Sequence, residues 1–168
     1  MNQIFTLTKI ANFITKYGIQ NTNIRKDANY TYVIDINGDV NLSNKNLTDP
    51  DMTAKFGKVT GNFECQNNNL TSLDFAPDFV GGDFDCSNNN LISLENAPEF
   101  VGGDFDCSNN QLTSLAGCPK EVKGYLNCIN NRNLKSLEGI KKVKGQIYSD
   151  FFEGKIENYG KKKLASQE

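Results

Sequence analysis

The chain has 168 residues with 18 Lys/Arg, 20 Asp/Glu and no histidine, a length that suits one domain with a continuous core. No apolar run approaches the roughly 20 residues that cross a bilayer, and the N-terminus lacks the basic and apolar regions of a secretory signal. We therefore expect a cytoplasmic protein without a membrane partner, and the missing histidine argues against proton-shuttle catalysis.

Charge is divided unevenly along the chain. Residues 1–118 hold seven Lys/Arg against fourteen Asp/Glu, whereas residues 119–168 hold eleven against six. No basic residue lies between Lys58 and Lys120. Such asymmetry bears on the choice of partner rather than on the fold.

The first predicted element is a helix over residues 4–17, and Gly18 is well placed to end it. A stacked-repeat protein exposes its core at each end unless something covers it. We therefore interpret residues 1–22 as an N-terminal capping helix and link. The alternative, a helix that binds a partner or a membrane, fits less well because the segment is short and not basic.

Residues 19–36 begin as a polar link and continue into a predicted strand over 30–36, which is rich in β-branched and aromatic residues. The next segment, from Gly38 to Leu47, aligns with Gly61 to Leu70, twenty-three residues later. We therefore expect a divergent first repeat near residues 38–60, within a repeat region that covers residues 23–150.

A regular array with a period of 21 residues follows. The stretch GDFDCSNNNLISL at 82–94 returns as GDFDCSNNQLTSL at 103–115. A fixed period predicts stacked coils, which start near residues 61, 82, 103 and 124. The columns that keep this step are Gly61, Gly82, Gly103, Gly124 and Gly145; Val59, Val80, Val101, Val122 and Val143; and Phe63, Phe84, Phe105, Leu126 and Ile147.

Four of the five cysteines keep the same step, at positions 65, 86, 107 and 128, and Cys118 lies outside it. We interpret the four as a ladder of free thiols that pack as small apolar side chains. They lack the paired spacing of a metal site, and a cytoplasmic location does not favour disulfides. We expect no bound metal and no cofactor.

The stretch from Phe105 to Leu115, FDCSNNQLTSL, resembles the LxLxxNxLxxL core of leucine-rich repeats. The unit looks like the short class of these repeats known in bacterial effectors, and FDCSNNxLTSL is similar to repeats in bacteriophage and bacterial proteins. The resemblance covers roughly residues 38–150. It implies an α/β repeat fold: a leucine-rich-repeat-like solenoid with short parallel strands, an N-terminal capping helix and a mostly irregular convex side.

One position departs from that pattern. The family's first leucine would fall on Gly102, whereas the apolar residue is Val101, so we expect a local difference where the strand begins. Within a repeat, strand alternation predicts Phe84 and Cys86 inward, with Asp83, Asp85 and Ser87 outward. The resemblance implies that three asparagines turn inward and bond the backbone of neighbouring coils; these are Asn68, Asn89 and Asn110.

The last segment, residues 151–168, is expected to form a C-terminal cap followed by a frayed basic tail. The apolar residues available to cover the last core layer are Phe151, Phe152, Ile156 and Tyr159.

Outward strand positions form columns in a stacked array, and the central columns are acidic. Like charges about 4.8 Å apart on adjacent strands repel, so the array keeps them at some cost in stability. In one interpretation this face binds a basic surface of a protein partner, with tyrosines as apolar anchors. In the other, the acids only keep a strand surface soluble. The candidate partner-binding residues are Glu64, Asp83, Asp85, Asp104, Asp106, Tyr125, Asn127 and Tyr148.

Other chemistries are less well supported. A Ca²⁺ site formed by the carboxylates would lack the loop carbonyls that such sites use. An enzyme is not expected, because the thiols are predicted to be buried and an open face has no pocket. The sign of the charge excludes DNA and RNA from the acidic face. The basic C-terminal third could touch phosphate, although such lysines more often form a solvated surface.

We therefore expect a protein-binding repeat module. The resemblance further implies a phage-encoded protein that inhibits a host factor, such as a defence component, in the host cytoplasm. Two alternatives stay open. One is a module that sequesters a small molecule near Tyr125 and Tyr148, and the other is a structural protein that assembles head to tail through its bipolar charge. A monomer is the favoured oligomeric state.

Overall fold

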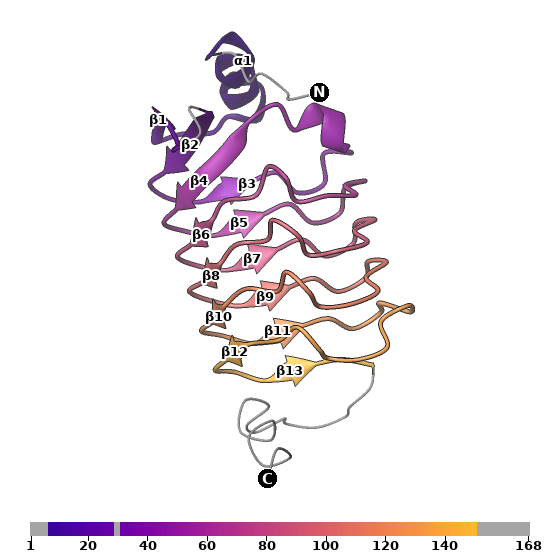
Figure 1. Cartoon of the computed structure of the whole chain (residues 1–168). Coiled ribbons are helices and arrows are strands. Elements are labelled where there is room, and N and C mark those ends of the chain that lie inside the picture. Colours follow the sequence, from indigo (N-terminus) through magenta and orange to yellow (C-terminus); the bar gives the residue numbers. More distant parts are fainter. Residues whose placement is uncertain (1–6, 29–30, 151–168) are drawn as a thin grey trace.

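A computed structural model describes residues 7–28 and 31–150, which form a solenoid of stacked parallel coils with one helix at its N-terminal end (Figure 1). The helix is α1 (Leu7–Tyr17), and a short 3₁₀ turn, η1, covers Asp49–Asp51. The strands are β1 (Thr22–Lys26), β2 (Tyr32–Ile36), β3 (Val40–Asn41), β4 (Lys55–Val59), β5 (Phe63–Glu64), β6 (Phe79–Val80), β7 (Phe84–Asp85), β8 (Phe100–Val101), β9 (Phe105–Asp106), β10 (Glu121–Val122), β11 (Leu126–Asn127), β12 (Lys142–Val143) and β13 (Ile147–Tyr148).

These strands form two sheets that run the length of the stack (Figure 1). Sheet A has seven strands in the order β1-β2-β4-β6-β8-β10-β12, and sheet B has six in the order β13-β11-β9-β7-β5-β3. Apart from the antiparallel pair β1–β2, neighbouring strands are parallel. From β4 and β5 onward they keep the 21-residue register, as in Phe63↔Phe84 and Val80↔Val101, whereas the first repeat is longer and pairs Ile36 with Val59 and Val40 with Phe63. The predicted solenoid of short parallel strands is confirmed.

The number of strands in each coil differs from the expectation. The sequence predicts one strand per repeat, around the Phe and Cys columns, with a local difference near Val101. The structure places Val101 at the end of a separate strand, β8, and a bend at Gly102 and Gly103 leads into β9. The valine column therefore builds a second parallel sheet, in which Val59, Val80, Val101 and Val122 are as fully buried as the phenylalanine column.

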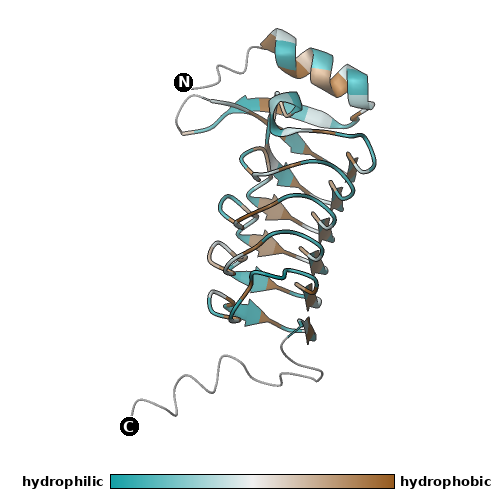
Figure 2. Cartoon of the chain, turned by 90° about the vertical axis from the view of Figure 1, so that its right-hand side faces the viewer, coloured by the Kyte–Doolittle hydropathy of each residue, from teal (hydrophilic) through white to brown (hydrophobic). Residues whose placement is uncertain are grey.

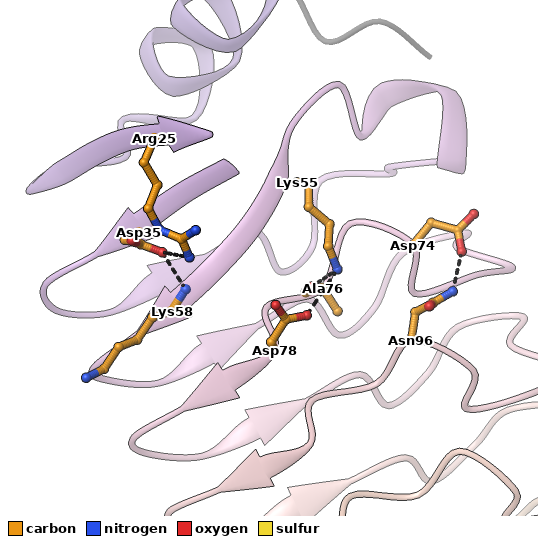
Figure 3. Close-up of polar contacts among 8 residues, drawn as sticks. All are labelled: Arg25, Asp35, Lys55, Lys58, Asp74, Ala76, Asp78 and Asn96. Carbon is orange, nitrogen blue, oxygen red and sulfur yellow. Dashed lines mark hydrogen bonds and ion pairs between the residues drawn. The ribbon is translucent and has the colours of Figure 1, made fainter. Parts of the chain in front are cut away.

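The polar segment before β2 also contains a strand that the sequence does not predict. Residues Thr22–Lys26 form β1, which pairs with β2 in a hairpin. Arg25 Nε donates to Asp35 Oδ2 at 2.5 Å, and Lys58 N–H donates to Asp35 Oδ1 at 2.8 Å (Figure 3). Burial opposes ionisation of Asp35, but these bonds outweigh it and hold its pKa below the usual value. One carboxylate thus joins the hairpin to the first coils.

Helix α1 covers the N-terminal end of the core and lies across the stack in Figure 2. It confirms residues 7–17 of the helix predicted over residues 4–17; residues 4–6 lie outside the described residues. Ile10 and Phe13 are buried, and the rings of Phe13 and Phe56 lie 6.2 Å apart. The helix ends at Gly18 in a left-handed conformation (φ +65°), where Gly18 N–H donates to Thr15 O and Ile19 N–H to Ile14 O. These two bonds satisfy carbonyls that the helix end would otherwise leave unpaired.

The core is a set of side-chain ladders. The rings of Phe63 and Phe84 lie 5.7 Å apart, and the same distance separates Phe84 from Phe105. Buried leucines complete the core of each coil. Leu134 is displaced by one residue in the sequence, yet it is buried like Leu70, Leu91 and Leu112. The C-terminal cap and basic tail predicted for residues 151–168 lie outside the described residues. In the described part of the chain, no helix is long and apolar enough to cross a membrane.

Buried asparagines bind each coil to the one before it. Asn110 Oδ1 accepts from Leu91 N–H at 2.9 Å, while its Nδ2 donates to the carbonyls of Cys86 and Cys107. Asn89 and Asn131 repeat this pattern, which Asn68 begins in the first coil. The predicted inward asparagines are confirmed, and each amide is satisfied by backbone groups of two coils.

Replacing Asn110 by Ala should lower the free energy of unfolding by about 3 kcal/mol, because one N–H and three carbonyls, those of Cys86, Cys107 and Ser108, would lose a partner inside the core. Urea denaturation measures the change. Asn90→Ala is the control, since Asn90 accepts only a surface bond from Gln111; we expect it to cost about 0.5 kcal/mol or less. Equal losses in the two variants would contradict the role assigned to the ladder.

The cysteines are buried and free, as predicted. Cys86, Cys107 and Cys128 each donate their thiol to a carbonyl of the following coil, at 3.3 to 3.4 Å. Burial raises the pKa of all five thiols, to about 12 for Cys118 and Cys128. They act as small apolar side chains with a weak donor.

All five thiols should therefore resist alkylation by iodoacetamide at mildly alkaline pH in the folded protein, and react once guanidinium chloride unfolds it. Mass spectrometry after timed quenching counts the labelled sites. Rapid labelling of a ladder cysteine in the folded protein would show that its thiolate is accessible and would contradict this expectation.

Candidate functional site

The eight candidate residues lie along the strands of sheet B and the bends that precede them. Glu64, Asp85, Asp106, Asn127 and Tyr148 are direct neighbours in register across β5, β7, β9, β11 and β13, and we call them the strand column. The residue two positions before each forms the bend column, whose members are Asn62, Asp83, Asp104, Tyr125 and Gln146, with Asp39 at its start. The structure thus brings the predicted residues together on one side of the stack.

The bend column holds neighbouring coils together, a role that the sequence does not predict. Asp83 Oδ1 accepts from Asp104 N–H at 2.8 Å, and Asp104 Oδ1 accepts from Tyr125 N–H at 2.9 Å. Asp39 and Asn62 make the same bond to the coil that follows each of them. Each side chain thereby satisfies a backbone donor that lies outside the strand ladder.

The glycine column makes room for these bonds. A Cβ atom at Gly103 would overlap Asp83 Oδ1 and press against the Gly82 carbonyl carbon, and one at Gly124 would overlap Asp104 Oδ1. Gly103 N–H also donates to Gly82 O at 2.8 Å, and Gly124 N–H to Gly103 O at 2.7 Å. The repeated Gly-Asp pair is therefore one stacking device, in which glycine allows close approach and aspartate supplies the acceptor.

The strand column makes local turns instead. Asp85 Oδ1 accepts from Ser87 N–H at 2.9 Å, and Asp106 Oδ1 accepts from Ser108 N–H at 2.8 Å. These two-residue side-chain turns start the bend after each strand. They also correct one expectation, because Ser87 and Ser108 are buried rather than outward.

Like charges meet in the middle of the strand column. The pKa of Asp85 is raised by burial and by the charges of Asp106 and Asp83, against the lowering effect of its bonds to Ser87. Amides lie beside both ends of the acidic run: Asn41 Nδ2 donates to Glu64 Oε2 at 2.5 Å, and Asn127 Nδ2 donates to Asp106 Oδ2 at 2.9 Å. Only Asp85 has acidic neighbours on both sides in this column.

Two tyrosines continue the acidic columns toward the C-terminal end. The rings of Tyr125 and Tyr148 meet edge to face with centroids 5.6 Å apart, and 38% and 45% of these residues is exposed. Tyr148 OH donates to Gln146 Oε1 at 2.7 Å. The pKa of Tyr125 is raised by partial burial and then by the charges of Asp104, Asp106 and Asp83. The phenol therefore lies within the field of the carboxylates.

A cavity lies elsewhere, at the other end of the stack. It has a volume of about 280 Å³ and lies between α1 and η1, with Phe13, Tyr17 and Asp51 in its wall. It lies at the opposite end of the solenoid from β11 and β13, which carry the alternative small-molecule site predicted near Tyr125 and Tyr148 (Figure 1). Among residues 7–28 and 31–150, no group of three or more Cys, Asp or Glu is placed to hold a metal ion.

Comparison of the chain with family models, curated proteins and solved structures finds no match. The fold itself defines the class: a parallel-strand solenoid with coils of about 21 residues and one N-terminal helix.

Asp85→Asn should raise the free energy of unfolding by roughly 0.5 to 1 kcal/mol at about pH 7, because it removes repulsion between adjacent strands. The asparagine keeps the acceptor, as Asn41 and Asn127 do at equivalent positions. A carboxyl whose pKa is raised by folding destabilises the folded state only when ionised, so the gain should vanish as the pH falls below about 4.

Urea denaturation at the two pH values tests this prediction. Asp83→Ala is the contrast, since it leaves Asp104 N–H without its acceptor and should cost about 1 kcal/mol. A loss of stability in Asp85→Asn at neutral pH would contradict the account of this column.

Proposed function

We propose that the chain is a protein-binding repeat module whose outer face on sheet B binds a partner with a basic surface. The observation that carries this proposal is that asparagine and aspartate make the same bonds in both columns. Asn62 supports the coil after it just as Asp83 does, and Asn127 makes the same turn as Asp106. The fold needs an oxygen acceptor at these positions and has no need of a charge.

The bonds to backbone N–H groups therefore do not require a charge at Asp83, Asp85, Asp104 or Asp106. Asp106 also uses its second carboxylate oxygen, which accepts from Asn127 Nδ2. At Asp85 the charge opposes folding. A carboxylate array of this kind favours approach of a basic partner and excludes acidic ones. The bonds that hold Asp83 and Asp104 also fix these carboxylates before a partner arrives, which reduces the entropy lost on binding.

Tyr125 and Tyr148 supply the apolar part of the proposed interface. Tyrosine offers a large contact area with little conformational entropy to lose, and such residues are common anchors at interfaces. An arginine or lysine of the partner could lie on the exposed Tyr148 ring of β13 while its charge faces Asp106 on β9, two strands away in sheet B. The combination fits a basic protein surface better than a small ligand, because it is broad and open.

The finer features of the proposal rest on the sequence resemblance. Similarity to the short leucine-rich repeats of bacteriophage and bacterial proteins suggests a phage-encoded protein, and the partner would then be a host factor, such as a defence component, that binding inhibits. The acidic face would in that case mimic the charge of nucleic acid.

A quadruple variant with Asn at positions 83, 85, 104 and 106 separates charge from fold, because each position keeps the oxygen that accepts from a backbone N–H. The side-chain bond from Asn127 Nδ2 to Asp106 Oδ2 is lost. We expect it to stay folded while its binding of basic proteins from a host lysate falls by about tenfold or more at low salt. Quantitative mass spectrometry of the captured proteins measures this, with wild type, the quadruple variant and Tyr148→Ala compared in parallel.

The matched control is Glu95→Gln/Glu138→Gln, which removes two exposed charges outside sheet B. A captured protein that depends on the four aspartates and Tyr148, but not on these two glutamates, identifies the partner. If wild type and the quadruple variant retain the same proteins at every salt concentration, the proposal fails.

A further inference from the structure

A second charged surface lies on sheet A, at the C-terminal end of the stack. In the parallel pair β10–β12, Glu121 is the direct neighbour of Lys142. Five lysines in and beside these two strands form what we call the lysine patch: Lys120, Lys123, Lys141, Lys142 and Lys144. It belongs to the other sheet from the candidate face described above, so the two surfaces can act independently (Figure 1).

The patch holds more positive charge than its neighbours neutralise. Lys120 pairs with Glu99 at 2.8 Å, while Lys123 and Lys142 share Glu121 at 2.7 and 2.8 Å. Within the described ranges, no ion pair involves Lys141 or Lys144. Five lysines less two carboxylates leave three positive charges in excess across two adjacent coils.

These charges are crowded. The pKa of Lys144 is lowered, first by its contact with Lys123 and further by Lys142. Hydrogen bonds from Lys123 and Lys142 lower the pKa of Glu121 to about 2, so this carboxylate stays ionised and keeps both lysines in place. The arrangement concentrates ammonium groups at a separation where they repel, which an anion from outside would relieve.

The patch has no apolar anchor. The Phe100 ring beside it is covered by Lys123 Nζ at 5.6 Å and is stacked on Phe79 at 4.9 Å, and Lys58 covers Phe79 in turn at 5.0 Å. Of the large apolar side chains exposed in the described part of the chain, none lies in β8, β10 or β12. A protein interface usually has a buried apolar centre, so this surface offers electrostatic contact alone.

We infer that the lysine patch binds the phosphate backbone of double-stranded nucleic acid. Lysine ammonium groups bind phosphate oxygens as point charges, and contact of this kind reads no base sequence. Binding that is limited to the phosphate backbone of a nucleic acid requires unneutralised cations on an accessible surface and needs no apolar anchor. The lysine patch has both properties. This site goes beyond the proposed function and does not depend on it.

Fluorescence anisotropy with a short mixed-sequence DNA duplex tests the inference on the full chain. We expect weak binding whose logarithm falls linearly with the logarithm of salt concentration, by about 0.9 for each phosphate neutralised. Lys142→Gln/Lys144→Gln should weaken binding about tenfold at low salt and reduce that slope by about 2. Lys45→Gln/Lys135→Gln, a pair of exposed lysines away from sheet A, should leave both unchanged.

Three results would overturn the inference: no binding to the duplex at low salt, equal weakening by both double variants, or equally tight binding of polyglutamate. The last would show a general attraction for carboxylates, as an acidic protein partner requires. Thermal denaturation of each variant confirms that it is folded. The quadruple variant with Asn at positions 83, 85, 104 and 106 separates the two proposals, because it should no longer bind the protein partner but should still bind the duplex.

Discussion

Every coil of this protein must lie against the one before it at the spacing of a β-sheet, and the polar groups of its bends must be satisfied at that spacing. Strand pairs of only two residues cannot do this alone. Three sets of hydrogen bonds complete the bonding. They are the Gly-to-Gly backbone bonds, the bonds to the aspartates and asparagines of the bend column, and those of the buried asparagines that follow each ladder cysteine by three positions. Because each set spans two coils, none of them exists in an isolated repeat, and stability arises from stacking.

Stacking also decides what the surface looks like. One outward side chain in a repeat becomes a column on the solenoid, so a single aspartate becomes a row of charges about 4.8 Å apart. The row of charges ends at an amide on each side, because Asn41 donates to Glu64 and Asn127 donates to Asp106. Where asparagine can replace aspartate without loss of a bond, the choice between them is free to follow function. This freedom separates the charge of the face from the stability of the coil.

The two sheets carry opposite charge at different heights of the stack. Carboxylates gather on sheet B in the middle coils, and lysines gather on sheet A in the last two. The lysine side chains have a structural part as well, because Lys123 and Lys58 cover the Phe79–Phe100 pair on an otherwise polar surface. A thin solenoid has little interior, so aromatic rings on the outer side of a sheet are shielded by the stems of charged residues.

The sequence by itself determined the period, the stacked coils, residues 7–17 of the helix predicted over 4–17, and the buried thiols, because each leaves a pattern of residue types at fixed steps. The inward asparagines followed from the resemblance to leucine-rich repeats. The sequence also grouped the candidate residues on one side. Only the tertiary structure decided that the valine column forms a second sheet, that Thr22–Lys26 forms a strand, and that Asp83 and Asp104 hold the following coil. The valine strands are only two residues long, too short to leave a pattern of their own. Thr22–Lys26 is a polar segment that becomes a strand by pairing with β2, and the bonds of Asp83 and Asp104 join residues of different coils. From the sequence, the carboxylates of Asp83 and Asp104 are predicted to be surface charges. In the structure, each also accepts a hydrogen bond from the backbone of the following coil.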